Sequence, residues 1–279
     1  MIGVELVKQL HRPRGWVTLG LVAAVPIVLV LVVGLSRPTV AERLGDYGSV
    51  VTNSSGLTLP LIALSAMLLF LLPLAVAVFA GETVAGEASW GSLRYLLARP
   101  VPRSRVLASK AVVAAGFSVA TVVVVVVSGV VGGVLAFGWH PVTVVDLQHT
   151  TVFHVAAATF SAPAMVLRTL AAAAFILATL ASTFAFAFFL STLTTRPFSA
   201  VAGGVGLSLV SRALDNVPGL HALSPWLPVT DSGTTAWTGF FTSPPQTTDV
   251  VHTLVVQAVY SAGFLIAAFV WFTRSDIVA

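Results

Sequence analysis

The chain has 279 residues, of which 57% are hydrophobic and only 9% are charged. Soluble domains carry roughly 25% charged residues, so this composition excludes an ordinary soluble protein. The chain has no cysteine, which excludes a disulfide framework and a thiolate metal site. Basic loops beside membrane spans account for the net charge of +4, without a basic face of the kind that binds nucleic acid.

The first residues repeat with the period of a helix. Ile2, Leu6, Val7 and Leu10 lie on one side at about 100° per residue, and the opposite side carries Glu5, Lys8, Gln9 and Arg12. The pattern predicts an interfacial helix over residues 1–15, lying flat on the inner leaflet of a membrane. A frayed, charged N-terminus is the alternative interpretation.

Six apolar runs follow, and each is compared with the about 20 residues that cross a hydrocarbon core about 30 Å thick. The predicted spans are residues 16–35, 57–80, 111–137, 169–190, 198–211 and 251–272. The fifth run is short and needs residues 212–214 to complete a crossing. The expected fold is therefore an all-α polytopic membrane protein with one transmembrane domain over residues 1–279.

The orientation follows from the basic residues, because Lys and Arg near span ends are retained on the cytoplasmic side. With the N-terminus inside, the inner segments hold Lys8, Arg12, Arg14, Arg94, Arg99, Arg103, Arg105, Lys110, Arg196 and Arg274. The outer segments hold Arg37, Arg43, Arg168 and Arg212. This asymmetry predicts that both termini are cytoplasmic.

The outer connections are residues 36–56, 138–168 and 212–250. The last is apolar but interrupted by prolines, so we expect re-entrant or interfacial helices that cap the outer mouth. Arg168, at the outer start of the fourth span, is expected to extend to lipid headgroups.

Small residues recur at four-residue spacing, which lets helix backbones approach closely in lipid. The pairs are Gly129 with Gly133, Ser199 with Gly203, and Gly204 with Ser208. Packing within one subunit is the favoured interpretation. The density of small residues in the fifth span also makes Ser199, Gly203, Gly204 and Ser208 candidates for a dimer interface.

No catalytic, cofactor-binding or metal-binding residues are predicted. The six apolar runs contain no Asp, Glu, Lys or Arg, so they lack the ionisable relay of a gradient-driven carrier. Neither Lys8 nor Lys110 follows a glycine, which excludes a phosphate loop, and the metal-helix and serine-elbow motifs of an intramembrane enzyme are missing. The histidines of the second outer connection have no ligand spacing and are interpreted as solvated; they are His140, His149 and His154.

The charge-dense stretch lies between the second and third spans, over residues 82–105. Trp90, Leu93 and Leu97 form an apolar helical stripe, and a neighbouring stripe is polar, with Glu87, Gly91 and Arg94. This predicts a short amphipathic cytoplasmic helix, ended by Pro100 and Pro102, that docks a soluble partner. A helix that only anchors the loop at the membrane surface is the alternative.

At these residues the chain resembles the type-2 membrane permeases of ATP-binding-cassette exporters. The matching positions are Glu87, Gly91, Ser92, Leu96, Leu97, Pro100, Val101, Arg103 and Lys110. Ser92 stands where threonine is usual and keeps the hydroxyl. The N-terminal helix, the six spans and the proline-broken outer connection extend the resemblance over most of the chain.

The resemblance implies a permease subunit that pairs with a second copy or a sister subunit and binds two separately encoded ATPases, which hold ATP and Mg²⁺. The coupling helix would cover residues 83–97. The implied ATPase contacts are Glu82, Glu87, Trp90, Gly91, Ser92, Leu93, Arg94, Leu97 and Arg103. We expect a bacterial cytoplasmic membrane and a hydrophobic or amphipathic cargo. The alternative function is a non-transporting scaffold or regulatory subunit of a membrane complex.

Overall fold

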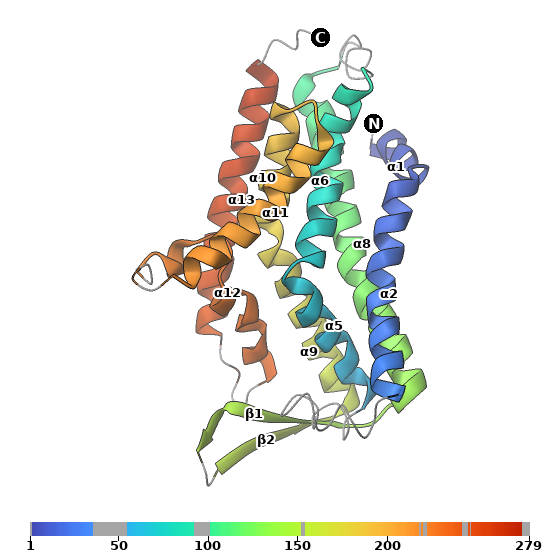
Figure 1. Cartoon of the computed structure of the whole chain (residues 1–279), viewed down its shortest axis with the longest axis vertical. Coiled ribbons are helices and arrows are strands. Elements are labelled where there is room, and N and C mark those ends of the chain that lie inside the picture. Colours follow the sequence, from blue (N-terminus) through green and yellow to red (C-terminus); the bar gives the residue numbers. More distant parts are fainter. Residues whose placement is uncertain are drawn as a thin grey trace.

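The computed structural model describes residues 2–35, 55–91, 101–151, 154–217, 222–241 and 247–274, together with Gly219 and Pro245. Within these residues six helical segments are long and apolar enough to cross a membrane. They form an elongated bundle in which α1 and the end of α13 lie at the same end (Figure 1). This arrangement confirms the expected helical membrane fold with six spans.

Most spans are longer than the apolar runs that predicted them. The helices are α1 (Ile2–Leu10), α2 (Pro13–Leu35), α5 (Leu59–Leu68), α6 (Leu71–Ser89), α8 (Arg103–Phe137), α9 (Ala162–Thr179), α10 (Ala181–Leu193), α11 (Pro197–Asp215) and α13 (Thr248–Arg274). Because the helices extend beyond the apolar runs, they take in charged residues at their ends, among them Glu87, Lys110 and Arg212.

The second predicted span is broken into two helices. A 3-10 turn, η1 (Gly56–Thr58), leads into α5, and α6 starts after a break at Leu69 and Phe70. Pro73 explains the break, because proline has no N–H for the carbonyl one turn earlier and its ring clashes with that carbonyl. Together α5 and α6 extend along most of the bundle (Figure 1).

The second outer connection contains an antiparallel hairpin that the sequence analysis does not predict. Strands β1 (Val142–Thr151) and β2 (His154–Phe160) pair with Val142 opposite Phe160. The hairpin lies across the end of the bundle opposite α1 (Figure 1). Val and Thr make up six of the ten residues of β1 and favour an extended strand, since β-branched side chains suit a pleated surface.

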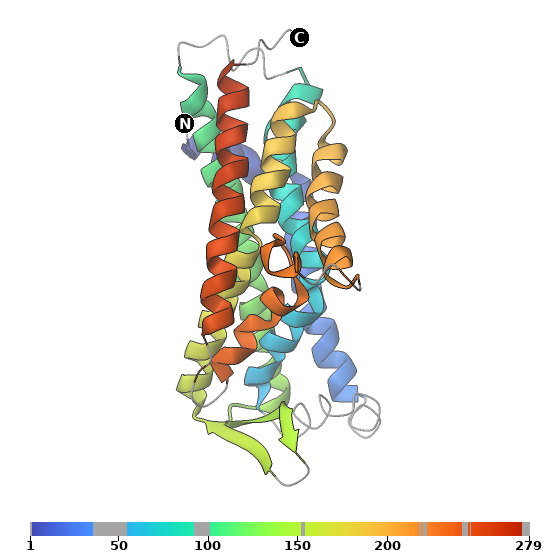
Figure 2. The same ribbon diagram turned by 90° about the vertical axis from the view of Figure 1, so that its left-hand side faces the viewer.

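The last outer connection contains short helices, and their predicted position as a cap on the outer mouth stays a prediction. They are η2 (Ser224–Trp226), α12 (Asp231–Thr235) and η3 (Ala236–Phe241). Both views show α11 ending well short of the hairpin, so these helices lie beside the bundle (Figures 1 and 2). α12 and η3 contact α9 and α13.

Two charged residues at the end of α11 fasten this segment. Arg212 Nη1 donates to Asp231 Oδ1 at 2.8 Å, and its Nη2 is 3.5 Å from the carbonyl oxygen of Leu68, at the break between α5 and α6. Asp215 accepts hydrogen bonds from the Ser224 hydroxyl and from the backbone N–H of Asp231 at 2.8 Å. The short helices are therefore held to α11 by polar contacts rather than by apolar packing alone.

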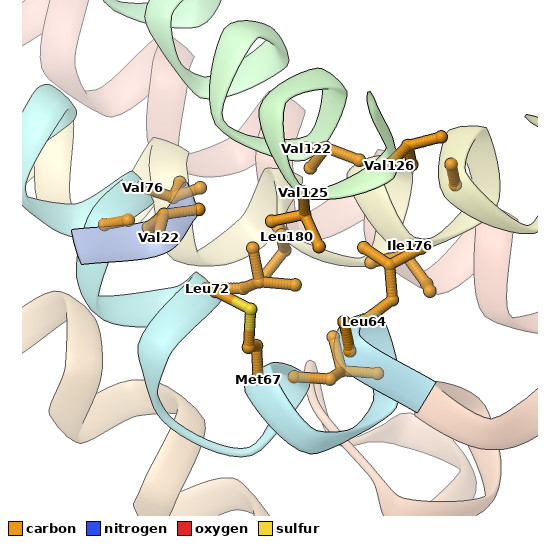
Figure 3. Close-up of a cluster of buried hydrophobic side chains, with 14 residues drawn as sticks. Val22, Leu64, Met67, Leu72, Val76, Val122, Val125, Val126, Ile176 and Leu180 are labelled. Carbon is orange, nitrogen blue, oxygen red and sulfur yellow. The ribbon is translucent and has the colours of Figure 1, made fainter. Parts of the chain in front are cut away.

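The apolar core lies at the same height in the bundle as the break between α5 and α6. Figure 3 shows Leu64 and Leu72, on either side of the break, directed toward Val125 of α8 and Ile176 of α9. All four side chains are buried. Because lipid tails are as apolar as leucine, this core stabilises the bundle by close packing rather than by exclusion of water.

The paired small residues pack within the subunit. A Cβ on Gly133 would lie 2.1 Å from the carbonyl oxygen of Gly56, and one on Gly129 would lie 2.7 Å from Pro60. In α11, a Cβ on Gly204 would lie 2.7 Å from the Cβ of Ala187. The Ser208 hydroxyl forms a hydrogen bond of 2.8 Å with the hydroxyl of Thr183 in α10.

Gly203 also lies against α10, because a Cβ there would be 2.1 Å from Leu190 Cδ1. Ser199 is exposed and donates its hydroxyl hydrogen to the carbonyl of Arg196 at 2.9 Å. Of the four dimer-interface candidates, three therefore have a packing role inside the chain. Pairing with a second copy through α11 stays a prediction.

We predict that Gly133→Ala destabilises the protein and that Gly116→Ala, in the same helix, does not. Overpacking costs about 1–3 kcal/mol, and the Gly56 backbone cannot rotate away as a side chain could. No atom lies within 4 Å of a Cβ on Gly116, where alanine gains about 1 kcal/mol of helix propensity. Thermal unfolding in detergent measures both; equal melting temperatures would contradict the close approach of α8 to η1.

The predicted orientation is testable because the chain has no native cysteine. Trp90 and Trp139 are exposed at opposite ends of the bundle. A membrane-impermeant maleimide added to intact cells should label Trp139→Cys, and Trp90→Cys should react only after the membrane is opened. The reverse labelling would invert the topology.

Candidate functional site

Four ionic side chains meet at the end of the bundle where the basic residues gather. Glu5 and Lys8 come from α1, Glu87 from the last turn of α6, and Lys110 from the second turn of α8. We call these four residues the Lys110 cluster. Lys110 and Glu87 each have only 1% of their side-chain surface exposed.

The ammonium of Lys110 has a complete set of acceptors. Its Nζ lies 2.7 Å from Glu87 Oε2, 3.1 Å from Glu5 Oε1 and 3.2 Å from the carbonyl oxygen of Thr83. Lys8 donates to the other carboxylate oxygen of Glu87. A lysine has three N–H donors, so each is matched, and the burial of charge is compensated by pairing.

The cluster explains the orientation of α1. The polar residues Glu5 and Gln9 are buried against the protein, and the apolar face formed by Ile2, Leu6 and Val7 is exposed. An exposed apolar face beside buried polar residues is the arrangement of a helix that lies on a lipid surface. The polar side of α1 therefore meets the Lys110 cluster, and its apolar side is left exposed.

Two further contacts tie the end of α6 to its neighbours. Ser191 Oγ of α10 accepts from the backbone N–H groups of Val84 and Ala85, at 3.0 and 2.9 Å. Glu82 accepts from Arg14 of α2 at 3.2 Å, in a pair whose side chains are 20% and 64% exposed. The exposed pair contributes little by itself, but it adds α2 to the helices joined here.

The helix α6 ends at the glycine of the loop motif. Gly91 has a φ of 66°, a left-handed conformation that glycine adopts without strain, and its N–H bonds the carbonyl of Ala88 at 3.1 Å. Trp90, just before it, has 81% of its surface exposed. Glu87 therefore lies inside the bundle, and Gly91, one turn later, ends the helix.

The structure separates the predicted ATPase contacts into groups. Trp90 is exposed, Glu82, Gly91 and Arg103 are half-buried, and Glu87 is buried in the Lys110 cluster. Residues 83–89, the predicted start of a separate coupling helix, are the last two turns of α6. The remaining predicted contacts lie outside the described residues; they are Ser92, Leu93, Arg94 and Leu97.

Sequence reasoning missed the internal role of Glu87. It placed Glu87 on the polar stripe of a docking helix, whereas the carboxylate faces Lys8 and Lys110. The available signal was the polar stripe of the N-terminal helix, which needs a polar partner if its apolar side faces lipid. Charge complementarity between that stripe and Glu87 and Lys110 could have identified the contact.

At the opposite end, Arg168 does not extend to headgroups as expected. Its guanidinium donates to the carbonyl of Phe240 and lies 4.1 Å from the centroid of the Phe160 ring. It therefore joins α9 to η3 and to the end of β2. Across the described part of the chain, no group of three or more His, Cys, Asp or Glu could hold a metal ion.

We predict that Lys110→Met destabilises the protein by about 3–5 kcal/mol, because it leaves the Glu87 and Glu5 carboxylates buried without their cation. The double variant Lys110→Met with Glu87→Leu should recover part of the loss, since Lys8 remains for Glu5. Arg14→Met, which breaks the exposed pair, should cost less than about 1 kcal/mol. Melting temperatures in detergent would contradict the cluster if Lys110→Met and Arg14→Met were alike.

A family model described as ABC-2 family transporter protein matches residues 1–193. A comparison with curated proteins finds no match. The matched region covers α1 to α10 and contains every member of the Lys110 cluster, whereas α11 and α13 lie beyond it. Because the match extends over more than half of the 279 residues, it confirms the resemblance seen in the loop: the chain belongs to the ABC-2 family of transporter proteins.

Proposed function

We propose that this chain is the permease subunit of an ATP-driven exporter in a bacterial cytoplasmic membrane. Separate ATPase subunits bind at the end of the bundle that carries Trp90, and ATP and Mg²⁺ are held by those subunits. Family membership supports the permease role. The Lys110 cluster is the observation that carries the coupling, because it connects the loop to three helices at once.

The cluster makes the loop end of the bundle mechanically continuous. α6 is one unbroken helix from Leu71 to Ser89, and its last turns bond α1, α8 and α10. Moving the end of α6 alone would separate Glu87 from Lys110 and leave buried charges unpaired, which is costly. A push on the loop is therefore transmitted to these helices as a block.

In the proposed cycle, ATP binding draws the two ATPases together and displaces the loop. The block then rocks relative to the rest of the bundle and exposes the cargo path to the opposite side. The driving force is the difference in nucleotide affinity between the two states, as population shift requires. The break between α5 and α6 gives the span a point at which its two halves can change angle.

The cargo we propose is hydrophobic or amphipathic, because the spans are lined by apolar side chains. A second permease copy or a sister subunit completes the path. Lipid contacts the exposed apolar face of α1 and the outward side of the spans.

We predict that Trp90→Ala weakens ATPase binding at least tenfold. An exposed tryptophan beside a docking loop is the residue type that most often dominates an interface. Trp139→Ala, which removes an exposed tryptophan at the other end of the bundle, is the matched control. Binding is measured by titrating the separately purified ATPase onto the permease in lipid nanodiscs.

Arg94→Glu is a second test of ATPase docking through this loop. Charge reversal at Glu87 would also disrupt the Lys110 cluster, so it does not test docking alone. Retention of full ATPase affinity and transport-coupled ATP turnover in both Trp90→Ala and Arg94→Glu would refute docking through this loop.

A further inference from the structure

A cavity of about 320 Å³ lies beside the short helices η2 and α12, and none of its lining residues belongs to the Lys110 cluster. It is enclosed by the end of α9, the segment that holds η2 and α12, and the first turns of α13. Its polar lining includes Thr179, Ser224, Thr234, Asp249 and Gln257. The volume is at the lower end of the range for ligand pockets, so it fits a small molecule or one headgroup.

Three hydroxyls of this lining already donate their hydrogen to the protein; they belong to Thr179, Ser224 and Thr234. Thr179 donates to the carbonyl of Ile176 at 2.8 Å, and Thr234 donates to the carbonyl of Thr230 at 2.9 Å. Ser224 donates to the carboxylate of Asp215. A hydroxyl has one hydrogen and two lone pairs, so these three oxygens retain only acceptor capacity.

The rim adds a negative charge. Asp249 is exposed in the first turn of α13, and an ionised carboxylate only accepts hydrogen bonds. His252 lies one turn further on, with its ring packed edge to face against Trp226 at 6.3 Å between centroids. The cavity thus combines acceptor oxygens inside with a carboxylate and aromatic surface at its mouth.

Donors at the cavity are few by comparison. The Gln257 amide is largely committed to the protein, since its nitrogen donates to the carbonyl of Pro228 and its oxygen accepts from the Ser182 N–H at 3.2 Å. Among the described side chains of the lining, one amide hydrogen of Gln257, the Thr253 hydroxyl and the His252 ring remain as donors. An acceptor-rich, negatively charged pocket complements a cation with several N–H donors and disfavours an anion.

We propose that this cavity binds the ammonium group of an amphipathic molecule, with the charge beside Asp249 and the adjoining carbons against Pro225, Leu227 and Val256. The binding site does not depend on ATPase coupling. The ammonium belongs either to a cargo amine or to a lipid headgroup of the outer leaflet.

The test uses the protein in dodecyl maltoside, a detergent that has no ammonium group. Isothermal titration calorimetry compares phenethylammonium with 2-phenylethanol, which matches its shape without the charge. We expect the ammonium to bind at least tenfold more tightly. Asp249→Asn should weaken the ammonium about tenfold and leave the alcohol unchanged, and Glu82→Gln, at the other end of the bundle, should alter neither. Equal affinity for both probes, or no effect of Asp249→Asn, overturns the proposal.

A second variant shows whether binding occurs in the cavity. Thr253 is half-buried in the lining, and Thr253→Phe should fill the space and abolish binding of both probes. An unchanged melting temperature shows that this variant folds. If it still binds phenethylammonium at the affinity of the unaltered protein, the site lies elsewhere and the proposal fails.

Nanodiscs then distinguish the two sources of ammonium. The difference in phenethylammonium affinity between the unaltered protein and Asp249→Asn is measured in phosphatidylglycerol, with and without phosphatidylethanolamine. If phosphatidylethanolamine abolishes the difference in affinity between the two proteins, the occupant is a lipid headgroup. If the difference persists in its presence, the occupant is a cargo amine. Absence of the difference in phosphatidylglycerol alone counts against the site.

Discussion

The ammonium of Lys110, held away from water between two carboxylates and a backbone carbonyl, constrains the whole loop end of this protein. A buried charge is tolerated only while its partners stay in place. The partners come from α1 and α6. These two helices and α8 must therefore keep their relative positions, because moving one of them alone would leave a buried charge unpaired. In the proposed mechanism, the same requirement makes the loop after α6 a lever, because α6 cannot slide without moving its neighbours.

The bundle is organised differently at its two ends. Near the loop, ionic and serine-mediated contacts join the helices into one block. Further along, the second span is broken at Leu69 and Phe70, α11 ends early, and Arg212 connects the short helices to the carbonyl of Leu68. In the proposed mechanism, the end joined by ionic contacts receives the push, and the segmented end changes shape.

Several features could be read from residue pattern alone. The six spans follow from apolar length. The end of α6 next to Gly91 was not predicted, because the sequence analysis continued a helix through this glycine to residue 97. The break in the second span was not predicted, because Pro73 was hidden in a continuous apolar run and hydropathy is blind to backbone hydrogen bonding. The hairpin at Val142 was missed although its β-branched residues were a local signal, because the analysis searched this connection only for helices and metal ligands. The contact of Arg168 with Phe240 was missed because it joins segments 72 residues apart.

The sequence by itself determined that this chain crosses a membrane, which of its segments do so, and to which transporter family its loop belongs, since composition and local motifs decide these properties. Only the tertiary structure decided where Glu87 points. Its position in the sequence is equally compatible with a docking surface and with a buried ion pair. The choice depends on Lys8 and Lys110, which reach it only because two distant helices pack against the end of α6.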